Sequence, residues 1–402
     1  MHNEEKRFKL TKLLYFGEIL PLFGKKKVQE SQPSPEIPLY REYQVKGATT
    51  GLEICNLNGE DAIVTGSLDS RGLTAISPDG DLLWNFDTGA TVYSVAVGRF
   101  DNETMVFAGS NAKVFALSPE GKKHWEFQMP ATKSKIYGGF AQVAKVEADM
   151  LKQYGTNDVY HIATGKLDNE GVIVAMAGAE YFYEGAQVIA KNGQLIRSMK
   201  KKTLGIQIPI NTFGGMMDIS SKGDAILMIA LQAKTAYGFS PDLQAFSLDG
   251  KVIHKTKVDV DPIKVGSGKT RYFEGGRQDK SRGKIKAGWF GDKPVAVIGL
   301  DVGGRSVVAV DLNGKQLWKY ETAAKGDINA GVTDVAIGQM TGAPVVIAGT
   351  IDGKVHLISA EGQMIKSRMY ESNIANVAYG KIKNRDAFAV GTFNGKIYVY
   401  LI

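Results

Sequence analysis

Short apolar runs separated by tight-turn sequences follow one another along most of this chain, and one phrase keeps returning. An apolar run ends in a four-residue turn that closes with Gly, such as Ser-Pro-Asp-Gly, and a second run follows that often contains Trp. The strongest copies occupy residues 75–84, 116–125 and 310–318, and fainter copies turn at Gly193, Gly250 and Gly362. Because one strand–turn–strand unit is repeated, we expect a repeat fold and not a series of unrelated domains.

The spacing of the turn glycines predicts a β-propeller. Successive glycines lie one propeller blade of about 40–50 residues apart, or one blade plus an insertion. In the second repeat, the apolar runs at residues 92–97, 104–108, 113–117 and 124–127 supply the four strands, A to D, of one blade. In a propeller, such four-stranded sheets stand around a central axis.

The two ends of the chain each supply part of one further blade. Residues 374–379, 387–390 and 396–400 are predicted as strands A, B and C, and residues 39–43 resemble the missing strand D. We therefore predict an all-β fold, a seven-bladed β-propeller closed by pairing of an N-terminal strand with the C-terminal blade, which leaves no unpaired edge between the ends. Residues 1–37 are assigned to a basic and apolar arm with a linker, and residues 38–402 to the propeller.

The longer connections are expected on one face of the ring. The D–A and B–C connections of a propeller share one face, here called the D–A face, and the A–B and C–D connections share the other, here called the C–D face. The predicted D–A insertions are at residues 129–137, 200–214 and 255–284, and the B–C insertions are at residues 178–186 and 232–242. On the C–D face, only an A–B connection near residues 149–156 is expected to be long. Long loops on one face of a rigid ring are where binding sites are usually found.

These insertions combine aromatic and basic side chains. The predicted partner-binding residues are Tyr181, Phe182, Tyr183, Lys200, Lys201, Lys202, Tyr237, Phe239, Lys269, Arg271, Tyr272, Phe273 and Arg277. The combination suits an acidic protein surface, and it also suits phosphate groups or single-stranded nucleic acid. The alternative is that the lysines are solvated and the aromatic rings pack within their own loops.

Charge and the N-terminal arm add only weak constraints on the partner. The formal net charge of +7 permits an acidic partner without requiring one. The basic and apolar residues 6–27 are expected either to dock on a protein or an anionic membrane surface, or to pack against the ring. The apolar stretch at residues 13–23 is broken by Gly17, Glu18 and Pro21 and has no small-residue cleavage site, so we expect a cytoplasmic protein, with peripheral membrane association as an alternative.

Sequence motifs of enzymes and metal sites are not found. The Gly268-Lys269-Thr270 segment resembles a phosphate loop, but Ile263 stands where that motif begins with glycine. The five histidines share no metal-ligand spacing, so neither a metal nor another cofactor is predicted. Charged residues near the innermost strands are expected to line the mouth of the central channel or simply to keep it solvated; they are Arg99, Asp101, Asp334, Lys381 and Lys383.

The recurring phrase resembles the repeat of the quinoprotein-like (PQQ-like) β-propeller family. Its form, apolar-Ser-Pro-Asp/Glu-Gly followed by Trp, is clearest at residues 75–86, 116–127 and 308–320, and the resemblance covers nearly all of the chain after residue 38. The resemblance implies the fold but does not choose among dehydrogenases, assembly scaffolds and other propellers. Many enzymatic members are exported and carry two adjacent cysteines, whereas this chain has a single cysteine, Cys55. The resemblance is therefore to the non-enzymatic branch, and the glycine-histidine and Trp-Asp pattern of typical WD40 rings is not found.

These observations predict a non-catalytic scaffold. The long loops of blades three to five would mediate protein–protein interaction. Two alternatives stay open. The first is a small-ligand-binding or cofactor-binding quinoprotein-like enzyme that uses the central channel. The second is a protein that associates with nucleic acid or anionic membranes through its basic loops.

Overall fold

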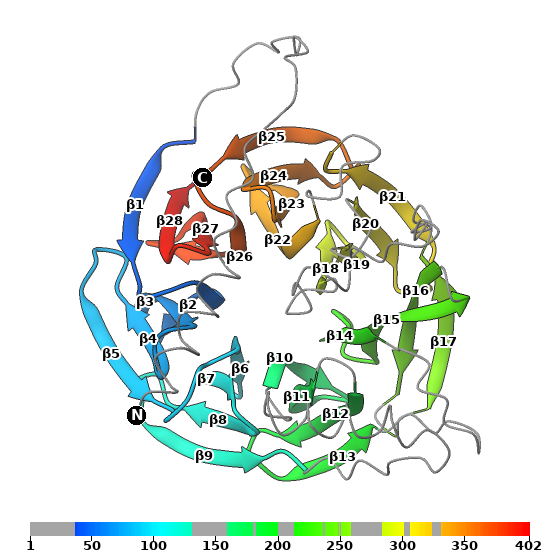
Figure 1. The fold of residues 1–402 in the computed structure, drawn as a ribbon, viewed down its shortest axis with the longest axis horizontal. Coiled ribbons are helices and arrows are strands. Elements are labelled where there is room, and N and C mark those ends of the chain that lie inside the picture. The colour runs from blue at the N-terminus through cyan, green and yellow to red at the C-terminus, as the bar shows by residue number, and fades with distance from the viewer. Residues whose placement is uncertain are drawn as a thin grey trace, which may run out of the picture.

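The computed structural model shows a ring of seven four-stranded antiparallel sheets around a central axis (Figure 1). The structure describes residues 37–130, 159–179, 182–199, 213–235, 238–247, 249, 251–258, 284–300, 306–323 and 331–402. Each sheet is one blade, and its strands run outward from the axis in the order A to D. The prediction of an all-β seven-bladed propeller is confirmed.

The first three blades follow the chain in order. Blade 1 consists of β2 (Thr49–Leu57), β3 (Glu60–Ser67), β4 (Gly72–Ile76) and β5 (Leu82–Asp87). Blade 2 consists of β6 (Ser94–Phe100), β7 (Glu103–Ser110), β8 (Lys113–Leu117) and β9 (Lys123–Gln128). Blade 3 consists of β10 (Val159–Leu167), β11 (Glu170–Ala179), β12 (Phe182–Ala190) and β13 (Leu195–Met199).

The next three blades repeat this arrangement. Blade 4 consists of β14 (Phe213–Ile219), β15 (Ile226–Thr235), β16 (Gly238–Phe246) and β17 (Val252–Lys257). Blade 5 consists of β18 (Lys284–Phe290), β19 (Lys293–Gly299), β20 (Ser306–Asp311) and β21 (Gln316–Glu321). Blade 6 consists of β22 (Val332–Met340), β23 (Ala343–Thr350), β24 (Lys354–Ser359) and β25 (Met364–Met369).

The seventh blade joins the two ends of the propeller. It consists of β26 (Ile374–Ile382), β27 (Arg385–Thr392), β28 (Lys396–Leu401) and, as strand D, β1 (Leu39–Gln44). Strand β1 runs antiparallel to β28, with Tyr43 opposite Ile397 and Glu42 opposite Tyr398. The predicted closure is therefore confirmed, and it pairs residues from opposite ends of the sequence.

Apolar packing between neighbouring blades forms the core. Among the described residues there are seven apolar clusters, and each lies in a joint between two blades. Consecutive residues of one strand face opposite joints: Ile63 packs toward blade 7 and Val64 toward blade 2, and both are fully buried. This is why the B strands read as continuous apolar runs and not as alternating ones. At about 25 cal/mol per Å² of apolar surface removed from water, the joints are the main source of stability.

A tryptophan on strand D links several blades to the C–D turn of the next blade. The Trp84 indole N–H donates a hydrogen bond to the carbonyl of Pro119 at 2.7 Å, and Trp125 and Trp318 repeat this contact in their own joints at 2.8 and 2.7 Å. The turn glycine lies under the ring, because a Cβ on Gly121 would stand 2.6 Å from Trp84 Cδ2. The repeated sequence phrase therefore encodes an interblade contact as well as a turn.

The remaining joints use other residues at this position. At the seal of the ring, the Tyr43 hydroxyl donates to the Pro78 carbonyl at 2.6 Å and takes the place of the indole. In blade 1, Trp84 of strand D lies opposite Ala75 of strand C. At the equivalent position of blades 3, 4 and 6, strand D has Arg197, His254 and Lys366, which lie opposite Val188, Ala245 and Leu357. These three substitutions explain why the sequence phrase is faint in the corresponding blades.

The predicted long A–B connection of blade 3 differs from the structure. The long A–B connection near residues 149–156 is wrong, because β10 begins at Val159 and the A–B turn of blade 3 is the tight pair Asp168-Asn169. Both turn residues have positive φ, 51° and 67°, as do Asp101 and Asn102 in the same turn of blade 2. A pair of such residues matches the two-residue hairpin turn that suits twisted strands, and Asn and Asp tolerate it best after Gly. Residues 149–156 therefore precede strand A, outside the described residues.

The tryptophan contact predicts a strong dependence on the turn glycine. Gly121 and Gly89 both have φ of +76°, but a Cβ on Gly89 would meet nothing within 4 Å. We expect Gly89→Ala to lower the free energy of unfolding by about 1 kcal/mol through backbone strain alone. Gly121→Ala adds the clash with Trp84 and should cost about 2–4 kcal/mol. Urea unfolding of the two variants measures the difference, and equal losses would contradict the packing role of the indole.

In the joint between blades 5 and 6, a histidine lies at a position that is phenylalanine in the joint between blades 1 and 2. His356 of β24 is 4% exposed, and the Tyr320 ring of β21 packs edge-on against it at 5.6 Å between centroids. The Tyr320 hydroxyl and His356 Nδ1 are hydrogen-bonded at 3.1 Å, whereas Nε2 is buried without a partner. In the joint between blades 1 and 2, Phe86 and Phe115 make the corresponding edge-on contact at 5.7 Å. Burial lowers the pKa of His356 to about 4.

This histidine should make the fold sensitive to mild acid. The unfolded chain binds a proton at His356 below its ordinary pKa of about 6.5, while the folded chain does so only below about 4. The free energy of unfolding should therefore fall by about 3 kcal/mol between pH 6.5 and pH 4 from this group. The double variant Tyr320→Phe, His356→Phe recreates the phenylalanine pair and should lose that part of the pH dependence. Urea unfolding between pH 7.5 and pH 4 tests this, and an unchanged slope in the double variant would count against it.

Candidate functional site

Most predicted partner-binding residues lie outside the described residues. These are Tyr181, Lys200, Lys201, Lys202, Tyr237, Lys269, Arg271, Tyr272, Phe273 and Arg277. The backbones of Phe182 and Tyr183 belong to β12, and that of Phe239 belongs to β16. Their assignment as a partner-binding surface stays a prediction.

Two of the predicted insertions are extended hairpins. Strand β11 pairs with β12 as far as Ala179 opposite Phe182, and β15 pairs with β16 as far as Thr235 opposite Gly238. The B–C segments at residues 178–186 and 232–242 are therefore mainly strand and not loop. The prediction ended these strands too early, because in the structure the pairing continues past the register shifts at residues 176–178 and 233–235.

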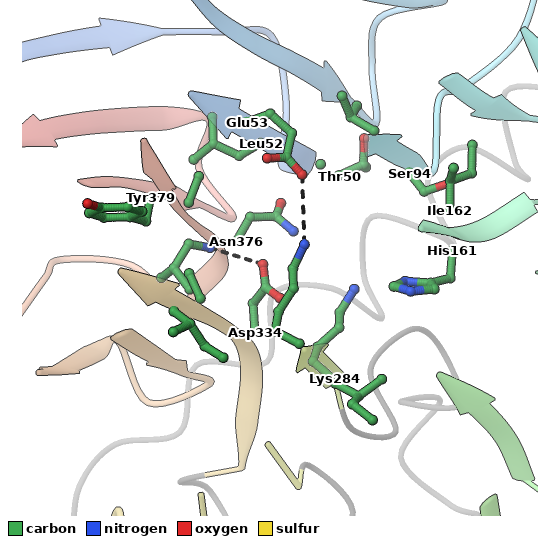
Figure 2. Close-up of a pocket in the computed structure, with 18 of the residues that line it drawn as sticks. Thr50, Leu52, Glu53, Ser94, His161, Ile162, Lys284, Asp334, Asn376 and Tyr379 are labelled. Atoms are coloured by element: carbon green, nitrogen blue, oxygen red, sulfur yellow. Dashed lines mark hydrogen bonds and ion pairs between the residues drawn. The ribbon is translucent and has the colours of Figure 1, made fainter. Parts of the chain in front are cut away.

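The described residues form a polar cavity on the axis, between the innermost strands. It has a volume of about 140 Å³ and is lined from β2, β6, β10, β18, β22 and β26. Figure 2 shows Glu53, Asp334 and Asn376 on one side of the cavity and Lys284 and His161 on the other. The formally charged lining residues are Glu53, Lys284, Lys286 and Asp334.

The strand register arranges these side chains in two layers. Ser94, His161, Lys284, Asp334 and Asn376 form the first layer, because each lies at the same distance from the last residue of its own A strand. The next position on the same side of each strand holds the second layer, which consists of Glu53, Ala96, Ala163, Lys286, Ala336 and Ala378. Because alanine is small, the second layer leaves room for the two charged side chains to meet across the axis.

Glu53 and Lys286 form that charged pair. Lys286 Nζ lies 3.9 Å from Glu53 Oε1, and the two side chains are 41% and 24% exposed (Figure 2). The Glu53 carboxylate raises the pKa of Lys286, while burial raises the pKa of Glu53 above its usual range. The ammonium group therefore stays charged at neutral pH, whereas burial disfavours the charged form of the carboxylate.

Two aspartates use their carboxylates to tie neighbouring A strands together. Asp334 Oδ1 accepts the backbone N–H of Val335 at 3.0 Å, and its Oδ2 accepts that of Val377 in blade 7 at 3.1 Å. Asp218 makes the same arrangement between blades 4 and 5, with Ala287 as the cross-blade donor at 2.8 Å. Their carboxylate oxygens are thus occupied by the backbone, and burial raises the pKa of Asp218. These aspartates are structural clamps that also add negative charge near the axis.

Other polar groups of the cavity keep unused hydrogen-bonding capacity. Asn376 is 7% exposed, and its Oδ1 has no hydrogen-bond partner among the described residues. Lys284 has no ion-pair or hydrogen-bond partner within the described part of the chain. Figure 2 shows the side chains of Asn376 and Lys284 directed into the space between the strands.

The sequence prediction found one residue of this cavity and missed the others. Asp334 lies where a channel residue was expected, whereas Arg99 and Lys381 do not line the cavity. Asp101 forms an ion pair with Lys191, and Lys383 pairs with Asp79. The missed signal is a polar residue followed by a branched residue and Ala near the start of strand A, as in Asp334-Val335-Ala336, Asn376-Val377-Ala378, His161-Ile162-Ala163 and Ser94-Val95-Ala96.

The described residues contain neither a metal cluster nor a membrane-spanning helix. No group of three or more His, Cys, Asp or Glu side chains in them is arranged to hold a metal ion. Nor does any helix there have the length and apolar character needed to cross a bilayer.

Comparisons with known proteins support the fold alone. The sequence matches no protein-family profile and no curated protein. The structure is similar to BBS1N in complex with ARL6DN, seen in crystals soaked with mercury or lead. For these, the TM-scores are 0.59 and 0.60 at 10% identity, covering 90% and 92% of this chain and 96% and 98% of the other. It is also similar to BamB from Moraxella catarrhalis, with a TM-score of 0.45 at 14% identity, covering 88% of this chain and 85% of that one.

The axial ion pair gives a testable consequence for stability. Lys286→Met leaves the Glu53 carboxylate without its partner and should lower the free energy of unfolding by about 1–2 kcal/mol, a value reduced for partial exposure. Adding Glu53→Gln removes the unpaired charge, so the double variant should be more stable than Lys286→Met alone. Urea unfolding of the single and double variants gives the coupling. Additive losses would show that the two side chains act independently.

Proposed function

We propose that this chain is a non-catalytic β-propeller scaffold that binds a protein partner on the D–A face of blades 3 to 5. The observation that carries the proposal is the uneven distribution of connections between the two faces. The C–D turns are short in every blade that has one, and the A–B turns have two residues except in blade 4, where residues 220–225 separate β14 from β15. The long intervals between strands lie after β9, β13 and β17, which are all D–A connections.

The composition of these connections supports a macromolecular partner. The interval between β17 and β18 contains Lys269, Arg271 and Arg277 together with Tyr272 and Phe273. Aromatic and arginine side chains are enriched among the residues that dominate binding at protein interfaces. The extended β11–β12 and β15–β16 hairpins reach the same face from blades 3 and 4.

A structural neighbour is consistent with a protein-binding role. BBS1N is in complex with ARL6DN, so a propeller of similar architecture occurs in a protein assembly. At 10% identity, this likeness carries no information on which surface or partner this chain uses. A cytoplasmic location, and docking by residues 6–27, remain part of the proposal on sequence grounds alone.

Charge reversal on the two faces tests the proposal. The test variant carries Lys269→Glu, Arg271→Glu and Arg277→Glu, and the control carries Lys122→Glu, Lys251→Glu and Lys315→Glu in three C–D turns. A partner is first purified by affinity capture with the intact chain from its own cells, and its dissociation constant is then measured for each variant. We expect the test variant to bind at least about tenfold more weakly and the control to bind within about twofold of the parent.

Two other outcomes would contradict the proposed interface. Weakening by the control alone would move the interface to the C–D face. Binding to single-stranded RNA or anionic vesicles that falls steeply with salt, without any protein partner, would favour the nucleic-acid or membrane alternative.

A further inference from the structure

We propose that a pocket on the outer rim of the ring, between blades 3 and 4, binds a tryptophan side chain that a partner protein presents on an extended segment. The pocket, here called the rim pocket, is lined by Asp168, Ile196, Arg197, Ser247 and Asp249. These residues belong to the A–B turn of blade 3, to strand β13 and to the C–D turn of blade 4. The inference goes beyond the proposed partner surface, because both turns lie on the C–D face.

The rim pocket lies where other joints of the ring hold an indole. Arg197 has the register position that tryptophan has in blades 1, 2 and 5. In those three joints, the indole N–H donates to a carbonyl of the next C–D turn. With Arg197 present, the rim pocket still has a volume of about 410 Å³, which is within the range of about 300–1,000 Å³ of ligand pockets. A site bounded by the same elements suits the same kind of side chain.

A second contact between blades is also changed in this joint. In three other joints, the first residue of the A–B turn bonds to the next C–D turn; the pairs are Asn58 with Glu120 at 3.3 Å, Asp101 with Lys191, and Lys383 with Asp79 at 3.2 Å. At the rim pocket, the corresponding residues are Asp168 and Asp249, and two carboxylates do not attract each other. Asp249 bonds to Ser247 and Lys251 of its own turn, whereas the Asp168 carboxylate has no partner among the described residues.

The two unpaired groups of the rim pocket complement the charge distribution of an indole. An aromatic ring has negative faces and a positive edge, and the indole N–H strengthens that edge. Arg197 is exposed, and its guanidinium group makes no hydrogen bond or ion pair within the described part of the chain, so this planar cation can stack on the ring. The Asp168 carboxylate can accept the N–H in a charge-assisted hydrogen bond. Phenylalanine has no N–H to donate, so the pocket selects tryptophan.

Exposed aliphatic side chains beside the pocket favour a polypeptide over a free small molecule. Leu195 and Ile196 at the start of β13 are 44% and 42% exposed. Val252 and Ile253 at the start of β17 are 54% and 55% exposed. Strands β13 and β17 are the outermost strands of neighbouring blades (Figure 1), so one extended segment can contact both. Exposed apolar groups of this kind mark surfaces that bind proteins.

Calorimetric titration of the full chain with three peptides tests the proposal. The probe is acetyl-Ser-Leu-Ser-Trp-Ser-Leu-Ser-amide, and phenylalanine or alanine replaces tryptophan in the two comparison peptides. We expect the tryptophan peptide to bind at least about fivefold more tightly than the phenylalanine peptide and at least about tenfold more tightly than the alanine peptide. Free indole should bind at least about tenfold more weakly than the tryptophan peptide, because it has no aliphatic neighbours.

Two variants assign the binding to the rim pocket. Arg197→Trp introduces the residue of blades 1, 2 and 5, and by filling the pocket it should weaken binding of the tryptophan peptide by at least about tenfold. Its control, Lys123→Trp, adds a tryptophan to β9 outside the pocket lining and should change binding by less than about twofold. Asp168→Gly removes the acceptor, and glycine tolerates the φ of +51° at this turn. It should reduce the preference for tryptophan over phenylalanine to less than about twofold.

Each result bears directly on the inference. No binding of the tryptophan peptide overturns it, and so does equal binding of the alanine peptide, because the site would then not recognise an aromatic ring. Free indole binding as tightly as the peptide would overturn docking of a protein and leave a small-molecule site.

Unchanged affinity in Arg197→Trp would place the peptide elsewhere and overturn the proposal. If circular dichroism shows that this variant does not fold, Asp168→Gly decides, and an unchanged preference for tryptophan would overturn the assigned contacts and the proposal with them. None of these outcomes bears on the D–A face, which is tested separately by charge reversal.

Discussion

Burial of every sheet between two others is the constraint on which this structure depends. A blade has two apolar faces, as Ile63 and Val64 show by packing into different joints from adjacent positions of one strand. No blade can cover both faces by itself, so a linear stack would always leave two apolar surfaces in water. Closing the stack into a ring removes both. The pairing of β1 with β28 holds that closure by backbone hydrogen bonds, and the Tyr43 contact to the next turn reinforces it.

The repeated phrase made the architecture predictable because local and global requirements coincide in it. The glycine has a positive φ that the turn needs, and its missing side chain also makes room for the neighbouring tryptophan. Because the glycine meets both requirements, it recurs together with the tryptophan and makes the repeat easy to recognise in the sequence. Where the indole is replaced, as at Arg197 and Lys366, the repeated sequence phrase is faint.

The candidate site was less predictable for two different physical reasons. Loops on the D–A face have no periodic pattern, so composition indicated charge and aromaticity but not where side chains lie. The axial cavity does follow a pattern, but a polar residue at the start of a strand, such as Asn376 or Asp334, is ordinary in a single strand. Its meaning emerges only when several A strands are aligned by their ends and brought around one axis. Asp334 and Arg99 are both charged residues of A strands, and without that alignment nothing in the sequence shows that only Asp334 lines the cavity.

The seal made from the two ends of the propeller has a consequence for how the molecule is assembled. Leu39 pairs with Tyr400, so nearly the entire sequence must emerge before the last joint can form. During synthesis, blade 1 would wait with one apolar face uncovered until β26–β28 arrive. Contacts of such long sequence separation slow folding and prolong the exposure of aggregation-prone surface. The native state, once sealed, gains in return a fold in which neither end of the ring can fray alone.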